Sequence, residues 1–207
     1  MLITPKTSKK TSANPWRTIP THQMPSMPDV PTPDFDDPKE IYAFFGLAVY
    51  AANILESSFI NWTVALRLGT ISGATRQDFD TAFAHFEKRT FGQLLKATHM
   101  LTAVPAGIEI VLNESLSERN RLIHKFFREH AANATHPAGQ KEMIVELSSM
   151  IELFNHADSL VTPIYQSLWE RFGVDEAMVE RELANLIRET ESKYGAVSPV
   201  HSRGSVA

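Results

Sequence analysis

The chain has 207 residues, 43% of them hydrophobic and 21% charged, so it holds enough apolar material for a buried core. It contains no cysteine, which excludes disulfide frameworks, thiolate metal sites and cysteine nucleophiles. Its 20 basic and 24 acidic residues give a net charge of −4, unlike the strongly basic balance of a general polyanion binder. Any contact with nucleic acid must therefore come from a local basic patch.

Proline dominates the N-terminal segment. Eight of the twelve prolines lie within residues 5–38, and proline fixes φ and removes a backbone donor, so this segment cannot propagate a helix or a central strand. We expect residues 1–36 to form a disordered arm and residues 195–207 a flexible tail. Lysines near the N-terminus are not followed by an apolar stretch, so we expect a cytoplasmic protein.

The first long helix is predicted over residues 41–67. Asp37, followed by proline at the first and Glu40 at the third helical position, indicates an N-cap with a capping box. The uninterrupted apolar run 41–52 is shorter than the roughly 20 residues that a membrane span needs. We therefore expect this helix inside a bundle and expect no contact with a membrane.

The rest of the chain continues in helical patterns. The elements expected are a helix opened by Thr75 and Asp78, helices over 93–101 and 106–130, a loop at 133–139, a helix over 141–172 bent at Pro163, and a charged helix over 175–194. Ile108, Leu112, Leu116, Ile123 and Phe127 mark one face of the helix over 106–130. The sequence predicts an all-α bundle of about five or six helices, forming one domain over residues 37–194.

Glu56 is the only charged side chain between residues 41 and 66. An unpaired carboxylate on a core helix is very costly, so Glu56 indicates a cationic neighbour on another helix. The alternative is a narrow strip that faces solvent with Asn53, Ser57 and Ser58.

The eight histidines are never three or four residues apart, so no helix presents a pair of them to a metal. His124, His130 and His136 are spaced by six residues, which favours exposed or helix-end positions. We expect no metal and no cofactor.

The segment 117–128, SERNRLIHKFFR, gathers groups that suit phosphate chemistry. Arginine binds phosphate oxygens bidentately, and histidine exchanges a proton near neutral pH. Arg119 and His124 lie about 140° apart around a helix axis. They therefore converge only if the arginine reaches round or a second copy completes the site. The alternative is a polar, solvated helix face with a capping histidine.

Arg119-Asn120-x-x-x-His124, followed by an aromatic pair, resembles the R-N-x-x-x-H signature of the HEPN superfamily (higher eukaryotes and prokaryotes nucleotide-binding domains). The segments GLAVYAANILESSFINW and TFGQLLKA are also similar to bacterial members, and the likeness covers roughly residues 38–170. It implies a HEPN-like core of four or five helices and a homodimer whose two motifs face one another across a cleft. Many members are metal-independent endoribonucleases of toxin–antitoxin, abortive-infection or CRISPR-associated defence, and others are catalytically inactive modules that bind RNA, nucleotide or protein.

For this chain the resemblance implies RNA as substrate and an antitoxin or regulatory protein as a further partner. It assigns catalysis to Arg119, which stabilises charge on the phosphoryl oxygens, and to His124, which transfers a proton or positions the phosphate. Asn120 holds the substrate or the histidine. The supporting residues that we add are Glu56, which orients Arg119, and Arg121, Lys125 and Arg128, which hold the RNA backbone. Both the endoribonuclease and the inactive binding module stay open at this point.

Overall fold

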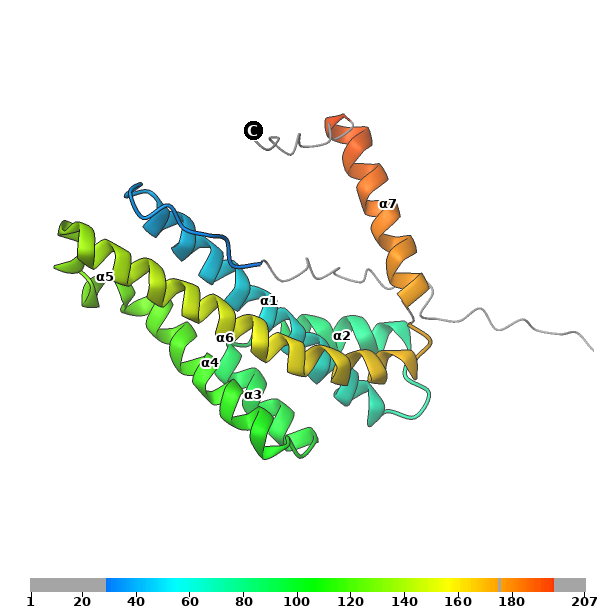
Figure 1. The fold of residues 1–207 in the computed structure, drawn as a ribbon. Helices are drawn as coiled ribbons and strands as arrows, with labels where there is room; N and C mark the ends of the chain where they lie inside the picture. Colours follow the sequence, from blue (N-terminus) through cyan, green and yellow to red (C-terminus); the bar gives the residue numbers. More distant parts are fainter. Residues whose placement is uncertain (1–28, 175, 196–207) are drawn as a thin grey trace, which may run out of the picture. The chain divides into compact units, whose positions relative to one another are not determined.

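The computed structural model describes residues 29–174 and 176–195, and this part of the chain contains helices and no strand. The elements in chain order are α1 (Glu40–Gly69), α2 (Arg76–Phe86), α3 (Phe91–Leu101), α4 (Ala106–His124), α5 (Phe126–Glu129), a 3-10 turn (Asn133–Thr135), α6 (Pro137–Glu170) and α7 (Glu176–Tyr194) (Figure 1). The predicted all-α class is confirmed. The chain divides into two compact units, one spanning Met24–Phe172 and the other containing α7.

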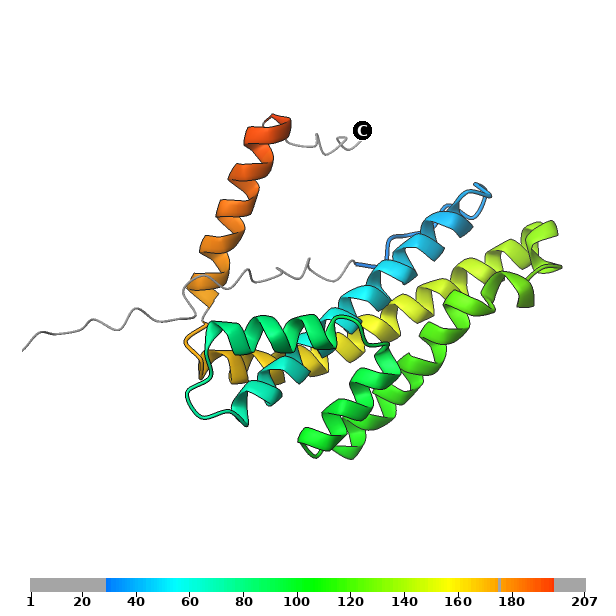
Figure 2. The same ribbon diagram turned by 180° about the vertical axis from the view of Figure 1, so that it is seen from behind.

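Helix α1 is the central helix of the unit Met24–Phe172. It is apolar nearly all round, which is typical of a helix buried on several sides, and it packs against α2, α3, α4 and α6. Helices α1 and α6 lie side by side and make the most extensive contact (Figure 1). Helices α2 and α3 pack against α1, and the view from behind shows them in front (Figure 2). By length and composition alone α1 is apolar enough to cross a membrane, a property that it shares with core helices of water-soluble proteins.

Aromatic contacts tie α2 and α3 to this core. Phe91, the first residue of α3, lies edge-on to Phe59 of α1 with ring centroids 4.9 Å apart. Phe79 of α2 meets Trp169 of α6 in the same manner at 5.7 Å. Each such pair adds about 0.5–1.5 kcal/mol beyond the area that it buries.

Two helices begin with capping boxes. Thr75 and Asp78 cap α2 as predicted, and the hydrogen bonds from the side chain and backbone of Thr75 lower the pKa of Asp78. Thr90 and Gln93 form an equivalent box for α3. The third helix therefore starts at Phe91, before the predicted residue 93, because Thr90 supplies the cap.

The predicted capping box at Asp37 is wrong. The Oδ1 atom of Asp37 accepts the backbone N–H of Lys39 at 2.9 Å, and the Asp37 carbonyl oxygen accepts the N–H of Glu40 at 3.1 Å. Asp37 thus closes a turn with its own neighbours, as aspartates in turns do. Helix α1 starts at Glu40, and its N-cap, Lys39, makes no side-chain capping bond.

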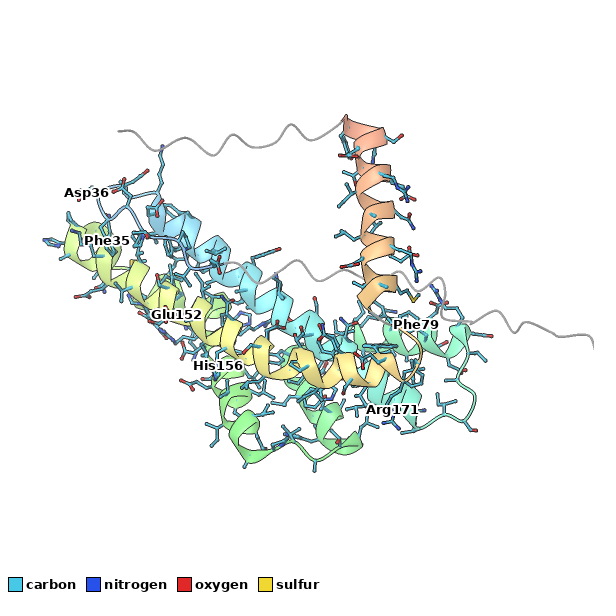
Figure 3. All side chains as sticks on the ribbon, turned by 45° about the vertical axis from the view of Figure 1, so that its right-hand side comes forward. Phe35, Asp36, Phe79, Glu152, His156 and Arg171 are labelled. Atoms are coloured by element: carbon cyan, nitrogen blue, oxygen red, sulfur yellow. The ribbon has the colours of Figure 1, made fainter. Side chains whose placement is uncertain are left out.

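The start of the chain is described from residue 29 only. Residues 1–28 and 196–207, which hold most of the predicted arm and tail, lie outside the described residues. Residues 29–36 form neither helix nor strand. The Phe35 ring lies 5.6 Å from Nζ of Lys141 near the start of α6 (Figure 3).

The predicted helix over 106–130 is interrupted at Lys125. Lys125 has φ −131° and ψ −26°, so α4 ends at His124 and α5 is a single turn. The inward stripe of this segment passes through Leu112, Ser115, Leu122 and Phe126, all of them buried. Its predicted apolar face is therefore wrong at the C-terminal end, where Ile123 and Phe127 are each 41% exposed.

Helix α6 starts earlier than predicted. The loop expected at 133–139 contains the 3-10 turn, and α6 begins at Pro137, with Nδ1 of His136 accepting the N–H of Ala138 at 3.1 Å. The helix continues through Pro163 to Glu170 as one element. Gly173, at φ +78°, follows it in the left-handed region that glycine favours.

The unit that contains α7 is described by that helix alone. Helix α7 spans Glu176–Tyr194, as predicted to within one residue, and Gly195 follows it at φ +87°. Leu186 and Ile187 are about half-exposed on it.

Candidate functional site

Glu56 of α1 and Arg119 of α4 form an ion pair. Oε2 of Glu56 lies 3.2 Å from Nη2 of Arg119, and the two side chains are only 17% and 22% exposed. The structure thus supplies the cationic neighbour that the sequence requires for Glu56. The alternative of a solvent-facing strip holds in part, because Asn53 is exposed and Glu56 and Ser57 are half-buried, whereas Ser58 is wholly buried.

The guanidinium of Arg119 is held on two sides. Besides Glu56, it contacts Asn120, whose Oδ1 accepts a long hydrogen bond of 3.5 Å from Nη1. An arginine has several N–H donors in a rigid fork, so donors remain for an anion. The ion pair with Glu56 fixes the direction of the guanidinium, and the remaining N–H donors can bind a phosphate.

His124 is the last residue of α4 and its side chain is exposed. Within the described residues its imidazole makes no hydrogen bond and no ion pair, and it does not contact Arg119. Arg119 points inward from α4, and His124 lies about 140° further round the helix. One chain therefore does not bring the two groups together, as the spacing predicts.

Arg121 is occupied by carboxylates. Its Nε lies 3.0 Å from Oε2 of Glu118 and its Nη1 lies 3.1 Å from Oε2 of Glu129. Its Nη2 also contacts Glu146 of α6. Three carboxylates would repel an RNA phosphate, so we leave Arg121 out of the RNA-binding set. Arg121 and its three carboxylate partners join α4, α5 and α6, and we call these four residues the ion-pair centre.

His130 belongs to the same cluster. Its Nε2 lies 2.8 Å from Oε2 of Glu146, and its Nδ1 lies 3.3 Å from Nδ2 of Asn133. Sequence analysis missed this cluster. The three-residue spacing of Glu118 and Arg121 indicates an ion pair within one helix. Glu146 is 25 residues away from Arg121, so the sequence gives no local sign of their contact.

Lys125 and Arg128 are exposed, and neither forms an ion pair within the described part of the chain. Asn120 is also exposed. These side chains therefore stay available to an RNA strand, in contrast to Arg121.

A second polar group, also missed, lies buried between α1 and α6. Asp158 is 9% exposed, and its Oδ1 accepts a hydrogen bond from Oγ of Ser58. Its Oδ2 accepts one from Thr162 at 3.2 Å. Burial raises the pKa of the neighbouring Tyr165, hydrogen bonds with Thr162 and Ser58 lower it, and the charge of Asp158 raises it again. Because Ser58 belongs to α1 and Asp158 to α6, their hydrogen bond joins the two helices.

The described residues contain no group of three or more histidine, aspartate or glutamate side chains that could hold a metal ion. Comparison with known proteins finds no match to this chain among family models, curated proteins or solved structures. Function must therefore be argued from the residues themselves.

Proposed function

We propose that the chain is a HEPN-like endoribonuclease that cuts RNA without a metal, as a homodimer, in a toxin–antitoxin or phage-defence role. The observation that carries the proposal is the ion pair of Glu56 and Arg119. A guanidinium held in advance by a carboxylate of another helix needs little reorganisation when charge develops on a phosphate. His124, exposed and unpaired within the described residues, supplies a proton-transfer group from the end of the same helix.

The reaction that these groups suit is an internal phosphoryl transfer. The 2′-oxygen of RNA forms a bond with the adjacent phosphorus while the bond from phosphorus to the 5′-oxygen breaks. The products are a 2′,3′-cyclic phosphate and a 5′-hydroxyl, and the proton that leaves the 2′-hydroxyl is balanced by one that joins the 5′-oxygen. His124 transfers a proton at one of these oxygens, and Arg119 stabilises the charge on the phosphoryl oxygens. Asn120 holds the substrate or the histidine by a hydrogen bond.

The helix geometry supports a homodimer. Arg119 and His124 lie on different sides of α4, so a single chain does not offer both to one phosphate. In a two-fold dimer the arginine of one copy faces the histidine of the other, and the cleft contains two such sets. Lys125 and Arg128 then hold the RNA backbone in contacts that weaken with salt.

The test is cleavage of single-stranded RNA by the full chain in EDTA. His124→Ala and Arg119→Ala are each expected to abolish cleavage while the dimer persists. His156→Ala, at an exposed position of α6, is the matched control and should cut normally (Figure 3). Cleavage that persists in both motif variants would remove these residues from the mechanism. RNA binding without turnover in the wild type would identify the inactive binding module instead.

The biological role has its own test. Expression of the wild type in bacteria is expected to arrest growth, and expression of His124→Ala is expected to leave growth unchanged. Equal growth of the two strains would contradict a toxin role while leaving cleavage in vitro as it is.

A further inference from the structure

Two exposed aromatic rings lie beside the motif. Tyr42, in the first turn of α1, is 69% exposed, and Phe127, in α5, is 41% exposed. Their ring centroids are 6.0 Å apart and their planes differ by 28°, so the rings are stacked. Phe45 supports them from α1, with its centroid 4.8 Å from that of Phe127. We call Tyr42 and Phe127 the aromatic platform.

Phe127 of the aromatic platform is next to the motif Arg119–His124 in the chain. Phe127 is three residues after His124, so their Cα atoms are at most about 11 Å apart. A strand whose phosphate reaches His124 can therefore place a neighbouring base on the rings.

The charges next to Phe127 in the chain favour a polyanion, whereas Asp37 and Glu40, which precede Tyr42, are acidic. Lys125 and Arg128 flank Phe127 in sequence, are exposed and form no ion pair among the residues described. The carboxylate of α5, Glu129, is already paired with Arg121.

We propose that the aromatic platform stacks an unpaired base of single-stranded RNA, adjacent to the phosphodiester that is cut. This inference rests on the proposed function and specifies its substrate class. Aromatic side chains stack the faces of bases regardless of sequence, and neighbouring cations hold the backbone. In a duplex those faces are covered by the adjacent base pairs, so the platform selects unpaired RNA. It also gives a chain of net charge −4 a local source of affinity.

The experiment measures the affinity of a labelled single-stranded RNA by fluorescence anisotropy. Every protein carries His124→Ala so that the RNA stays intact. Tyr42→Leu and Phe127→Leu each remove a ring and keep apolar bulk, whereas Tyr42→Phe keeps the ring. Tyr194→Leu, at a 74% exposed position of α7, is the matched control.

Loss of either ring is expected to weaken binding by about 5- to 100-fold. Tyr42→Phe and Tyr194→Leu should bind like the parent. A duplex of the same sequence should bind more weakly and respond little to loss of the rings. Each variant should remain folded at the assay temperature and sediment like the parent, which separates this loss from misfolding. Since Tyr42 is so exposed, its variants provide the test even if Phe127→Leu unfolds.

Three results would overturn the inference. Equal affinity in the ring variants and the parent, with cleavage intact in the wild type, would overturn the platform alone and leave the proposed function standing. A shift from dimer to monomer in the ring variants, with affinity falling in step, would make the rings a protein interface. A wild type that neither binds nor cuts RNA would overturn both proposals.

Discussion

Glu56 and Arg119 are 63 residues apart in the sequence, and their side chains approach to 3.2 Å between α1 and α4. The arginine occupies an inward position of α4, close to the buried Ser115 and Leu122. An unpaired cation at such a position is strongly disfavoured. The ion pair therefore lets α4 pack against α1 and at the same time aims the guanidinium.

The first prediction concerns Glu56→Gln. This change keeps the shape of the side chain and removes its charge, so Arg119 loses its fixed direction. We expect kcat for RNA cleavage to fall by up to about 100-fold, the cost of a misplacement near 1 Å, while KM changes little. Glu152→Gln, at an exposed position of α6 (Figure 3), is the matched control and should leave kcat unchanged.

Stability gives the second half of this test. Glu56→Gln is expected to lower the free energy of unfolding by about 1 kcal/mol, between the values for exposed and buried pairs. Glu56→Asp, which keeps the charge, should recover part of kcat. If kcat is unaffected while stability falls, the pair serves packing only.

Local signals predicted much of this fold. The threonine–aspartate box marked the start of α2, and the predicted end of α6 at residue 172 lies two residues beyond the observed end at Glu170. The requirement that Glu56 have a cationic partner is also readable from sequence, because it follows from the apolar residues around it. These features depend on neighbours within a few positions.

Other features depend on tertiary contacts. The inward stripe of α4 includes polar Ser115 and an arginine, so the apolar residues Ile123 and Phe127 gave a misleading face at its C-terminal end. Lys125 ends the helix without a glycine or proline to signal it. The contact of Arg121 with Glu146 joins two helices and leaves no pattern along either.

The second prediction concerns the ion-pair centre. Arg121→Met leaves Glu118, Glu129 and Glu146 without the guanidinium that joins them, and among the described residues only Glu146 keeps a basic neighbour, His130. We expect the free energy of unfolding to fall by about 1–3 kcal/mol, less than for a fully buried pair because the site is partly screened by solvent. Urea unfolding followed by circular dichroism measures it.

Salt and a control variant separate this effect from general damage. Added salt screens the repulsion among the carboxylates, so the loss should shrink as ionic strength rises. Arg128→Met, at an exposed arginine without an ion pair in the described region, should leave stability nearly unchanged. Equal losses in the two variants would contradict a structural role specific to Arg121.

The third prediction concerns Gly139 in the first turn of α6. A Cβ atom at this position would lie 2.5 Å from the carbonyl oxygen of Asn133 and 2.6 Å from its Cα. Both are backbone atoms and cannot move aside by a change of rotamer. Gly139→Ala is therefore expected to lower the free energy of unfolding by about 1–3 kcal/mol.

Gly46 of α1 provides the control. No atom lies within 4 Å of a Cβ built there, so Gly46→Ala should be neutral or stabilise the helix by up to about 1 kcal/mol. Thermal unfolding of the two variants should move in different directions. An unchanged free energy of unfolding in Gly139→Ala would show that the 3-10 turn moves aside without loss of stability.

The last prediction concerns Tyr165 and alkaline pH. Burial raises the pKa of Tyr165 above its ordinary value of 10.0, against the opposing effect of hydrogen bonds with Thr162 and Ser58. The folded chain therefore holds this proton more tightly than the unfolded chain. Its contribution to stability is complete below pH 10.0 and is lost as the pH rises from there through the raised value.

Tyr165→Phe removes this titration and keeps the ring. We expect the free energy of unfolding of the wild type to fall more steeply than that of Tyr165→Phe once the pH passes 10.0. At about pH 8 an ordinary tyrosine is protonated. The difference in the free energy of unfolding between the two proteins at that pH therefore reports only the contacts of the hydroxyl group that Tyr165→Phe removes. Denaturant unfolding over a series of pH values measures both. Parallel curves would mean that Tyr165 meets water in the folded chain, contrary to its burial between α1 and α6.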